Sequence, residues 1–151
     1  AQTLGLPLIA SWVGRESAPI VAQLAQRYNV RVGDENHPER DAGALKETIA
    51  GHEEWIGVAL DTGNLAAQGG DPVKAVYDLS ERLIYLHFKD ILPGPGHTCC
   101  ALGRGIVDVR GVVRALREVG YEGVLSIEIE TIDHDPTDEI IESAQLLREL
   151  L

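Results

Sequence analysis

The stretch IGVALDTGNLAAQGGDPVKAVYDLSERLIYLHFKD, residues 56–90, decides the fold. It opens with the apolar run 56–61 and closes with a second one, 82–89, and each has the length of a buried strand. Between them, TGN at 62–64 predicts a turn, and DP at 71–72 predicts the capped start of a helix. This order predicts one strand–helix–strand unit of a parallel sheet.

The same alternation of short apolar runs and helical patterns continues on both sides of this unit. Three more strands are predicted at 4–12, 30–36 and 123–130, and four more helices at 17–28, 42–52, 108–119 and 135–151. The run at 4–12 is apolar almost throughout, which predicts a strand buried on both faces. Ser17, Asp71 and Asp108 are expected to cap the helices that follow them.

Five successive parallel strands fit either an open doubly wound sheet or part of a (β/α)8 barrel. The chain has 151 residues, whereas a complete barrel typically needs about 250. In the barrel interpretation, a third to a half of the barrel is therefore missing. No linker, repeat or low-complexity tract interrupts residues 1–151, so we expect a single domain.

Composition excludes several classes of protein. With 24 acidic and 13 basic residues the net charge is -11, which argues against a nucleic-acid partner. No apolar run approaches the roughly 18 to 20 residues of a membrane span, and the first residues lack the basic region of a signal peptide. We therefore expect a cytoplasmic protein without a membrane partner. Cys99 and Cys100 are adjacent, so a disulfide framework is not expected.

Potential metal ligands stand at the ends of four predicted strands. They are Glu35, Asp61, His87 and either Glu128 or Glu130. The carboxyl ends of parallel strands lie on one edge of a sheet, so these side chains are expected to become neighbours. Three carboxylates and one imidazole suit Mn²⁺, Mg²⁺, Co²⁺ or Zn²⁺ better than copper or iron–sulfur chemistry.

The motifs around these residues, in this order, give the chain a resemblance to a known family. They are ENH at 35–37, LDTGN at 60–64, GDP at 70–72, LHFKD at 86–90, LGRGIVD at 102–108 and GYEGVLSIEIE at 120–130. The chain resembles the xylose isomerase-like sugar isomerase and epimerase superfamily, whose TIM barrels include hexulose epimerases and inosose dehydratases. The resemblance implies an α/β fold made of the last four to five βα units of a (β/α)8 barrel, a C-terminal half-barrel.

The resemblance also implies a metal centre and a reaction. The ligands would be Glu35, Asp61, His87 and Glu128, where Glu128 matches the first Glu of the family's last strand. The metal, with Mn²⁺ as the first expectation, would polarise the carbonyl of a sugar or polyol. Glu35 and Glu128 would then remove and return a proton through an enediolate.

Four further residues are expected to bind substrate: His37, Asn64, Lys89 and Arg104. His37 is expected to orient a ligand or a substrate hydroxyl. Asn64 departs from the well-studied epimerases, which place a substrate-contacting His there, and it also suits a turn. Asp90 is expected to contact substrate or to pair with Lys89. LGRG at 102–105 lacks the full phosphate-binding fingerprint, which favours a flexible loop.

Alternatives remain open at this point. Each strand-end carboxylate alone is commonly a helix cap or an ion pair. The chain can also be a non-catalytic, truncated or designed half-barrel, an inosose dehydratase-like lyase, or a DNA-repair endonuclease of the same superfamily, which the net charge disfavours. An open half-barrel exposes two strand edges, so we expect either a homo-oligomer or a missing N-terminal half to cover them.

Overall fold

The computed structural model describes residues 1–39, 41–95 and 97–151. Seven strands are present in these residues: β1 (Leu8–Ser11), β2 (Arg31–Glu35), β3 (Ile56–Asp61), β4 (Leu83–Phe88), β5 (Asp90–Ile91), β6 (Cys99–Cys100) and β7 (Val124–Ile127). The helices are the 3-10 helix η1 (Gln2–Leu4) and the α-helices α1 (Ala18–Tyr28), α2 (Ala42–Ile49), α3 (Thr62–Ala67), α4 (Pro72–Leu79), α5 (Val109–Glu118) and α6 (Thr137–Leu150).

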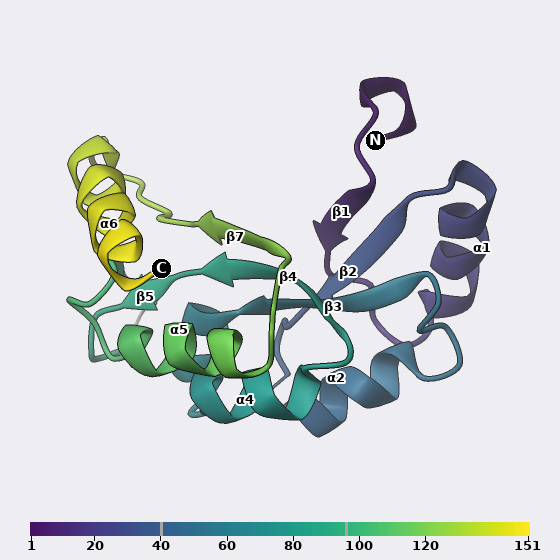
Figure 1. Cartoon of the computed structure of the whole chain (residues 1–151), viewed down its shortest axis with the longest axis horizontal. Coiled ribbons are helices and arrows are strands. Elements are labelled where there is room, and N and C mark those ends of the chain that lie inside the picture. The colour runs from purple at the N-terminus through teal and green to yellow at the C-terminus, as the bar shows by residue number, and fades with distance from the viewer. Residues whose placement is uncertain (40, 96) are drawn as a thin grey trace.

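The five long strands form one parallel sheet in the order β1-β2-β3-β4-β7. This order follows the chain, and the sheet curls with α1, α2, α4 and α5 along its convex side (Figure 1). A doubly wound sheet would instead reverse its strand order and carry helices on both faces. The observed arrangement confirms the prediction of a partial (β/α)8 barrel.

The core lies between the sheet and these helices. Every residue of β3 is buried, since the strand lies in the middle of the sheet. Leu60 and Phe88 on the strands pack in one apolar cluster with Leu45 and Leu79 on the helices, and all four are fully buried. Burial of apolar surface of this kind is the main favourable contribution to folding.

Aspartates start most of these helices. The carboxylates of Asp41, Asp71 and Asp108 each accept a hydrogen bond from the backbone N–H three residues further on, which satisfies a donor that the helix leaves free. The predicted caps at Asp71 and Asp108 are thus confirmed. The predicted cap at Ser17 is wrong, because its side chain makes no capping hydrogen bond to α1.

Two predicted elements differ from the structure. Within the apolar run 4–12 only Leu8–Ser11 forms a strand, and its burial alternates, with Ile9 42% exposed. The expectation of burial on both faces is wrong because β1 is the first strand of the sheet and pairs with β2 alone among the described residues. TGN at 62–64 does not form an isolated turn but opens α3, and the Asp61 carboxylate caps that helix through Asn64 N–H.

The loop after β4 is built around the Asp90 carboxylate. Asp90 is fully buried and accepts hydrogen bonds from the backbone N–H groups of Ile91, Gly103, Gly105 and Val107, at 2.9 to 3.0 Å. A Cβ at Gly105 would come within 2.2 Å of Asp90 Oδ1, so this close approach requires glycine. The glycines of LGRG therefore bind a carboxylate of the chain itself, and Asp90 pairs with this backbone rather than with Lys89.

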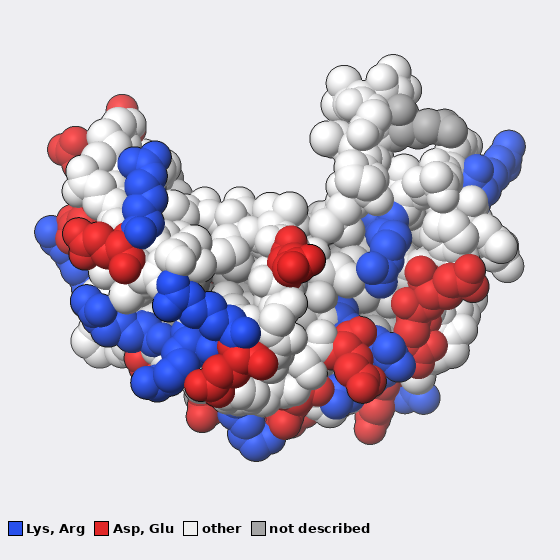
Figure 2. Space-filling model, viewed as in Figure 1, with Lys and Arg blue, Asp and Glu red and all other residues white. Residues whose placement is uncertain are grey.

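The sheet has two open edges, at β1 and β7, within the described part of the chain. Figure 2 shows a hollow between these two ends that is lined mainly by uncharged residues, whereas the charged residues gather over α2, α4 and α5. Beside β1, an apolar groove of about 510 Å³ is lined by residues that include Ile9, Trp12, Leu24 and Tyr28. These four side chains are each more than 40% exposed.

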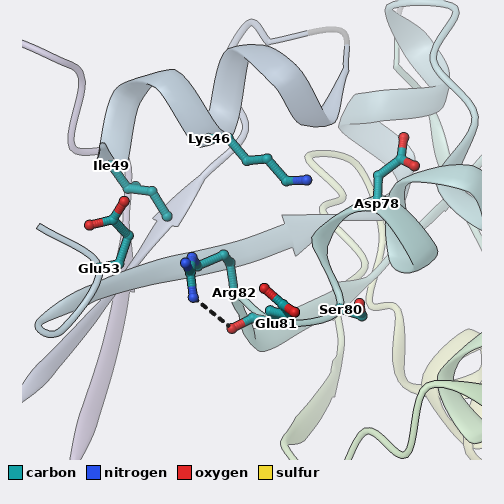
Figure 3. Close-up of a pocket in the computed structure, with 7 residues that line it drawn as sticks. All are labelled: Lys46, Ile49, Glu53, Asp78, Ser80, Glu81 and Arg82. Carbon is teal, nitrogen blue, oxygen red and sulfur yellow. Dashed lines mark hydrogen bonds between the residues drawn. The ribbon is translucent and has the colours of Figure 1, made fainter. Parts of the chain in front are cut away.

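A second cavity, of about 410 Å³, lies at the amino ends of β3 and β4 (Figure 3). Its lining mixes both charge signs: Lys46, Ile49, Glu53, Asp78, Ser80, Glu81 and Arg82. In barrels of this type the chemistry takes place at the opposite, carboxyl ends of the strands. This cavity therefore lies away from the edge where the predicted ligands converge.

Candidate metal centre

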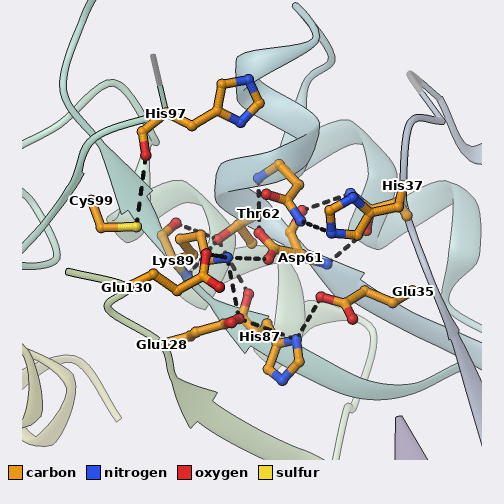
Figure 4. A network of polar contacts seen from close by, with 12 residues as sticks. Glu35, His37, Asp61, Thr62, His87, Lys89, His97, Cys99, Glu128 and Glu130 are labelled. Atoms are coloured by element: carbon orange, nitrogen blue, oxygen red, sulfur yellow. Dashed lines mark hydrogen bonds and ion pairs between the residues drawn. The ribbon is translucent and has the colours of Figure 1, made fainter. Parts of the chain in front are cut away.

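Four predicted ligands meet at the carboxyl edge of the sheet. Glu35 and Asp61 are the last residues of β2 and β3, His87 lies near the end of β4, and Glu128 directly follows β7. Asp61 and His87 are paired in register. One ligand atom from each of the four lies within 4.8 Å of the others, and Figure 4 shows their side chains pointing toward one another.

His87 links the two glutamates of this group. Its Nδ1 lies 2.9 Å from Glu35 Oε1 and 3.3 Å from Glu128 Oε2. The two glutamates come from β2 and from the end of β7, which are separated in the sheet by β3 and β4. The imidazole thus lies between one carboxylate from each side of the site.

Lys89 places an ammonium among the carboxylates. Its side chain is only 4% exposed, and Nζ lies 3.0 Å from Asp61 Oδ2, 3.4 Å from Glu128 Oε2 and 3.0 Å from Glu130 Oε2. Figure 4 shows these contacts converging on one nitrogen. Glu130 is not a member of the four-residue group; it contacts Lys89, and its side chain is 71% exposed.

Asn36 fixes the backbone of Asp61. The Asn36 amide donates from Nδ2 to the Asp61 carbonyl at 3.0 Å, and Asn36 Oδ1 accepts from Asp61 N–H at 2.7 Å. Asn36 is buried, and it ties the end of β2 to the end of β3 at the level of the candidate ligands. No role was predicted for Asn36 from the sequence, although its place directly after Glu35 at a strand end is a usable signal.

Thr62 performs a similar task between β3 and β4. Its hydroxyl donates to the Lys89 carbonyl at 2.6 Å and accepts from Lys89 N–H at 3.0 Å. Thr62 is fully buried and Lys89 is 3% exposed. These bonds hold the Lys89 backbone next to the end of β3, which brings the ammonium to Asp61.

The donor set fits a divalent cation. Asp61 Oδ2 and Glu128 Oε2 are buried and have no hydrogen-bond partner within the described residues, although both lie near the Lys89 ammonium. Buried oxygens of this kind are costly unless a charge compensates them. Three carboxylates and one imidazole are ligands that Mn²⁺, Mg²⁺, Co²⁺ and Zn²⁺ accept.

The electrostatics of the group follow from these contacts. The hydrogen bond from His87 lowers the pKa of Glu35 below its usual value, although burial opposes this effect. The same hydrogen bond raises the pKa of His87. Burial raises the pKa of Glu128, an effect that nearby Lys89 and His87 partly offset. Burial alone would lower the pKa of Lys89, but Asp61, Glu130 and Glu128 outweigh it and raise that pKa.

The other predicted site residues lie in different surroundings. His37 Nε2 lies 3.0 Å from Asn64 Nδ2, which joins two residues predicted to bind substrate. Arg104 forms an exposed ion pair with Glu142 of α6. His97, Cys99 and Cys100 do not belong to a metal-binding group within the described residues.

A family model described as "Xylose isomerase-like TIM barrel" matches residues 15–150. "Putative L-ribulose-5-phosphate 3-epimerase SgbU" of Escherichia coli (strain K12) is 34% identical over 96 residues, which cover 59% of this chain and 33% of that protein. "Inosose dehydratase" of Lacticaseibacillus casei is 26% identical over 91 residues, covering 50% of this chain and 30% of that protein.

Solved structures share the fold. The "Xylose isomerase domain protein from Planctomyces limnophilus" superimposes with a TM-score of 0.81 at 24% identity, over 99% of this chain and 60% of that one. The chain spans about a third to a half of the length of the curated relatives it matches. Within the described residues, no helix is both long enough and apolar enough to cross a bilayer.

Proposed function

The chain belongs to the xylose isomerase-like TIM-barrel family, and on that premise we propose that it is the metal-binding half of a sugar or polyol isomerase or epimerase. The convergence of Glu35, Asp61, His87 and Glu128 within 4.8 Å carries this proposal. We assign the half-barrel domain to residues 1–151. The expectation of a cytoplasmic protein stays a prediction.

The four residues of this group are the proposed ligands, and Mn²⁺ is the metal we expect first. Bound there, a divalent cation supplies Lewis acidity to a carbonyl and so acidifies the neighbouring C–H bond. Asp61 is a good anchor because its Oδ1 accepts from Asn64 N–H, which leaves Oδ2 to face the site, where it contacts the Lys89 ammonium.

Glu35 and Glu128 are the proposed proton-transfer groups. They approach the site from opposite sides, one from β2 and the other from the end of β7, and both contact His87. An epimerase must remove a proton from one face of a carbon and return one to the other face. Two carboxylates on opposite sides of one site suit that task.

His37, Asn64 and Lys89 are the proposed substrate contacts. The His37–Asn64 pair is exposed, so its polar atoms are accessible to hydroxyl groups. Arg104 remains a prediction of the same kind. Its guanidinium pairs with Glu142, as the Lys89 ammonium pairs with carboxylates of the site.

Completion of the barrel is part of the proposal. The open edges of β1 and β7 and the apolar groove beside β1 suit further βα units of the same barrel. The solved relative, of which this chain covers 60%, provides a precedent for such units. Light scattering distinguishes their source: a mass of two or more times 16.4 kDa indicates further copies of this chain. A monomer places the further units in another polypeptide or in a longer form of this one.

The test is proton exchange at carbon. The chain, in its assembled state and loaded with Mn²⁺, is incubated with a panel of ketoses and ketose phosphates in D₂O. We expect deuterium beside the carbonyl and an epimeric product, both lost in Glu35→Gln and Glu128→Gln. Glu118→Gln serves as the matched control, because Glu118 is an exposed glutamate at the end of α5 that accepts a hydrogen bond from Tyr77 and belongs to none of the proposed contacts. Exchange that survives in both site variants would refute the proposal.

A dehydratase is the second candidate, favoured by the 26% identity to an inosose dehydratase. Dehydration begins with the same proton removal but then expels a hydroxide from the adjacent carbon. The two reactions are separated by product mass. An epimerase conserves the mass of its substrate, whereas a dehydratase releases one water.

A further inference from the structure

The buried ammonium of Lys89 contacts one oxygen on each of two proposed metal ligands. Asp61 Oδ2 lies 3.0 Å and Glu128 Oε2 lies 3.4 Å from Lys89 Nζ. Both oxygens are buried, and the geometry gives neither a well-aligned hydrogen bond within the described residues. Lys89 therefore places a positive charge against both of them.

A lysine in this position opposes the binding of a metal. Asp61 and Lys89 side chains are 0% and 4% exposed, so water screens their charges only weakly. A divalent cation held by Asp61 and Glu128 would repel an ammonium that remained at hydrogen-bonding distance from both. Either the metal is excluded or the ammonium has to move.

Glu130 offers the ammonium another place. Its Oε2 accepts a hydrogen bond from Lys89 Nζ at 3.0 Å, and it lies outside the four-residue group. Its side chain is 71% exposed, so that it is free to follow the ammonium. Glu130 stands two residues after Glu128, and the two carboxylates meet on the same nitrogen.

We infer that Lys89 is a built-in counter-cation that competes with the metal for Asp61 and Glu128, and that Glu130 is a positioning residue that retains the ammonium once a metal has displaced it. This inference rests on the proposed metal centre. Glu130 then has a role other than metal ligation. The affinity for the metal depends on Lys89 and Glu130, although neither residue needs to contact the metal.

A double-mutant cycle tests this coupling by calorimetric titration with Mn²⁺. Lys89→Met removes the competitor and is expected to tighten binding by about tenfold or more. Glu130→Gln replaces the carboxylate that balances the displaced ammonium with a neutral amide, and it is expected to weaken binding by about tenfold. In the Lys89→Met background the Glu130→Gln change is expected to have less than about a threefold effect, because there is no ammonium left to retain.

Matched controls come from ion pairs elsewhere in the chain. Lys74→Met removes an exposed lysine that pairs with Asp78, and Glu142→Gln removes a carboxylate that pairs with Arg104. Both change the net charge as the test variants do. Neither is expected to alter Mn²⁺ affinity more than about twofold, because exposed charges at a distance are screened.

The outcomes separate this inference from the proposed function. If the native protein binds Mn²⁺ and Lys89→Met binds it with the same affinity, the inference is overturned, whereas the proposed metal centre is still supported. A Glu130→Gln effect of equal size in both backgrounds also overturns it, since Glu130 would then act through its own charge. If neither the native chain nor Lys89→Met binds Mn²⁺, both proposals fail.

A measurement on the native chain covers the case in which Lys89→Met does not fold. The ¹⁵N resonance of the Lys89 ammonium is followed by NMR during titration with diamagnetic Zn²⁺. We expect this resonance to shift on binding in the native chain and to broaden into exchange with water in Glu130→Gln. An ammonium resonance that Zn²⁺ leaves unchanged would overturn the inference.

Discussion

Asp61 and Asp90 are both fully buried aspartates near the carboxyl ends of neighbouring strands, yet their surroundings are opposite. The Asp90 carboxylate accepts four backbone hydrogen bonds. Asp61 accepts one through Oδ1, while its Oδ2 pairs with the Lys89 ammonium at 3.0 Å. A carboxylate held by four backbone donors organises the chain around it, whereas one balanced by a single ammonium can exchange that partner for another cation.

The largest effect is expected from removing the satisfied carboxylate. Asp90→Ala leaves four backbone donors without their partner, and we expect a loss of at least about 4 kcal/mol in the free energy of unfolding. Asp108→Ala, the loss of a helix cap in the same region, is expected to cost about 1 kcal/mol. Denaturant unfolding measures both. Equal losses in the two variants would remove the structural role assigned to Asp90.

Removing the ion-paired carboxylate is expected to affect metal binding above all. Asp61→Asn keeps the oxygen that caps α3 but takes one carboxylate from the buried Lys89 ammonium, so its stability without metal should fall by on the order of 3 kcal/mol. Saturating Mn²⁺, at 100 times its Kd, is expected to stabilise the native chain by about 2.7 kcal/mol. In thermal unfolding, Asp61→Asn should show almost none of this stabilisation by Mn²⁺. Asp71→Asn, which also changes a helix cap, should retain it in full.

The support of Asp61 by Asn36 gives an intermediate effect. Asn36→Ala removes both hydrogen bonds between the ends of β2 and β3, and a misplaced Asp61 should weaken Mn²⁺ binding by about 10- to 100-fold. Val113→Ala, on the buried face of α5, supplies a variant of reduced stability with an intact site. Comparable metal affinities in the two variants would mean that Asn36 acts through stability alone.

Asp34 is a third buried aspartate, with one oxygen bonded to Val13 N–H and the other orphaned. Burial raises its pKa to about 6, so the folded chain holds a proton there that the unfolded chain releases near pH 4. Its contribution to stability is present below pH 4 and is lost as the pH rises through 6. Relative to Asp34→Asn, the native chain should lose on the order of 2 kcal/mol between pH 4 and 8. Parallel pH profiles of the two proteins would contradict this.

The smallest effect is expected at Arg104, on the loop that Asp90 organises. Its ion pair with Glu142 is exposed, and pairs of this kind contribute about 0 to 1 kcal/mol. Arg104→Ala should change the free energy of unfolding by no more than about 1 kcal/mol, and the free energy of Mn²⁺ binding by no more than the same amount. A loss of ketose binding without a loss of metal binding would instead support the predicted substrate contact.

The sequence predicted the four-residue group because the argument needed only the strands and their direction. When successive strands are parallel and adjacent, their carboxyl ends lie at the same edge of the sheet, regardless of the conformations of the individual side chains. The same reasoning left Glu128 and Glu130 as alternatives. The family resemblance favoured Glu128, and the positions of the side chains now distinguish the two residues, with Glu128 near His87 and Glu130 in contact with Lys89.

The contrast between Asp61 and Asp90 could not be predicted, because both residues follow apolar strands in similar patterns. Asp90 is satisfied by Gly103, Gly105 and Val107, which return to it only because of the path of the loop. The exposure of β1 likewise depends on what lies beside its open edge, and a local pattern contains no information about that neighbour.

Anomalous diffraction from crystals soaked in Mn²⁺ tests the central claim most directly, since it locates the ion without relying on activity. The account predicts one strong peak within coordination distance of Glu35, Asp61, His87 and Glu128, with the Lys89 ammonium turned toward Glu130. A peak elsewhere on the chain, or an ammonium that keeps both Asp61 and Glu128 while the soaked crystal shows no manganese there, would contradict it.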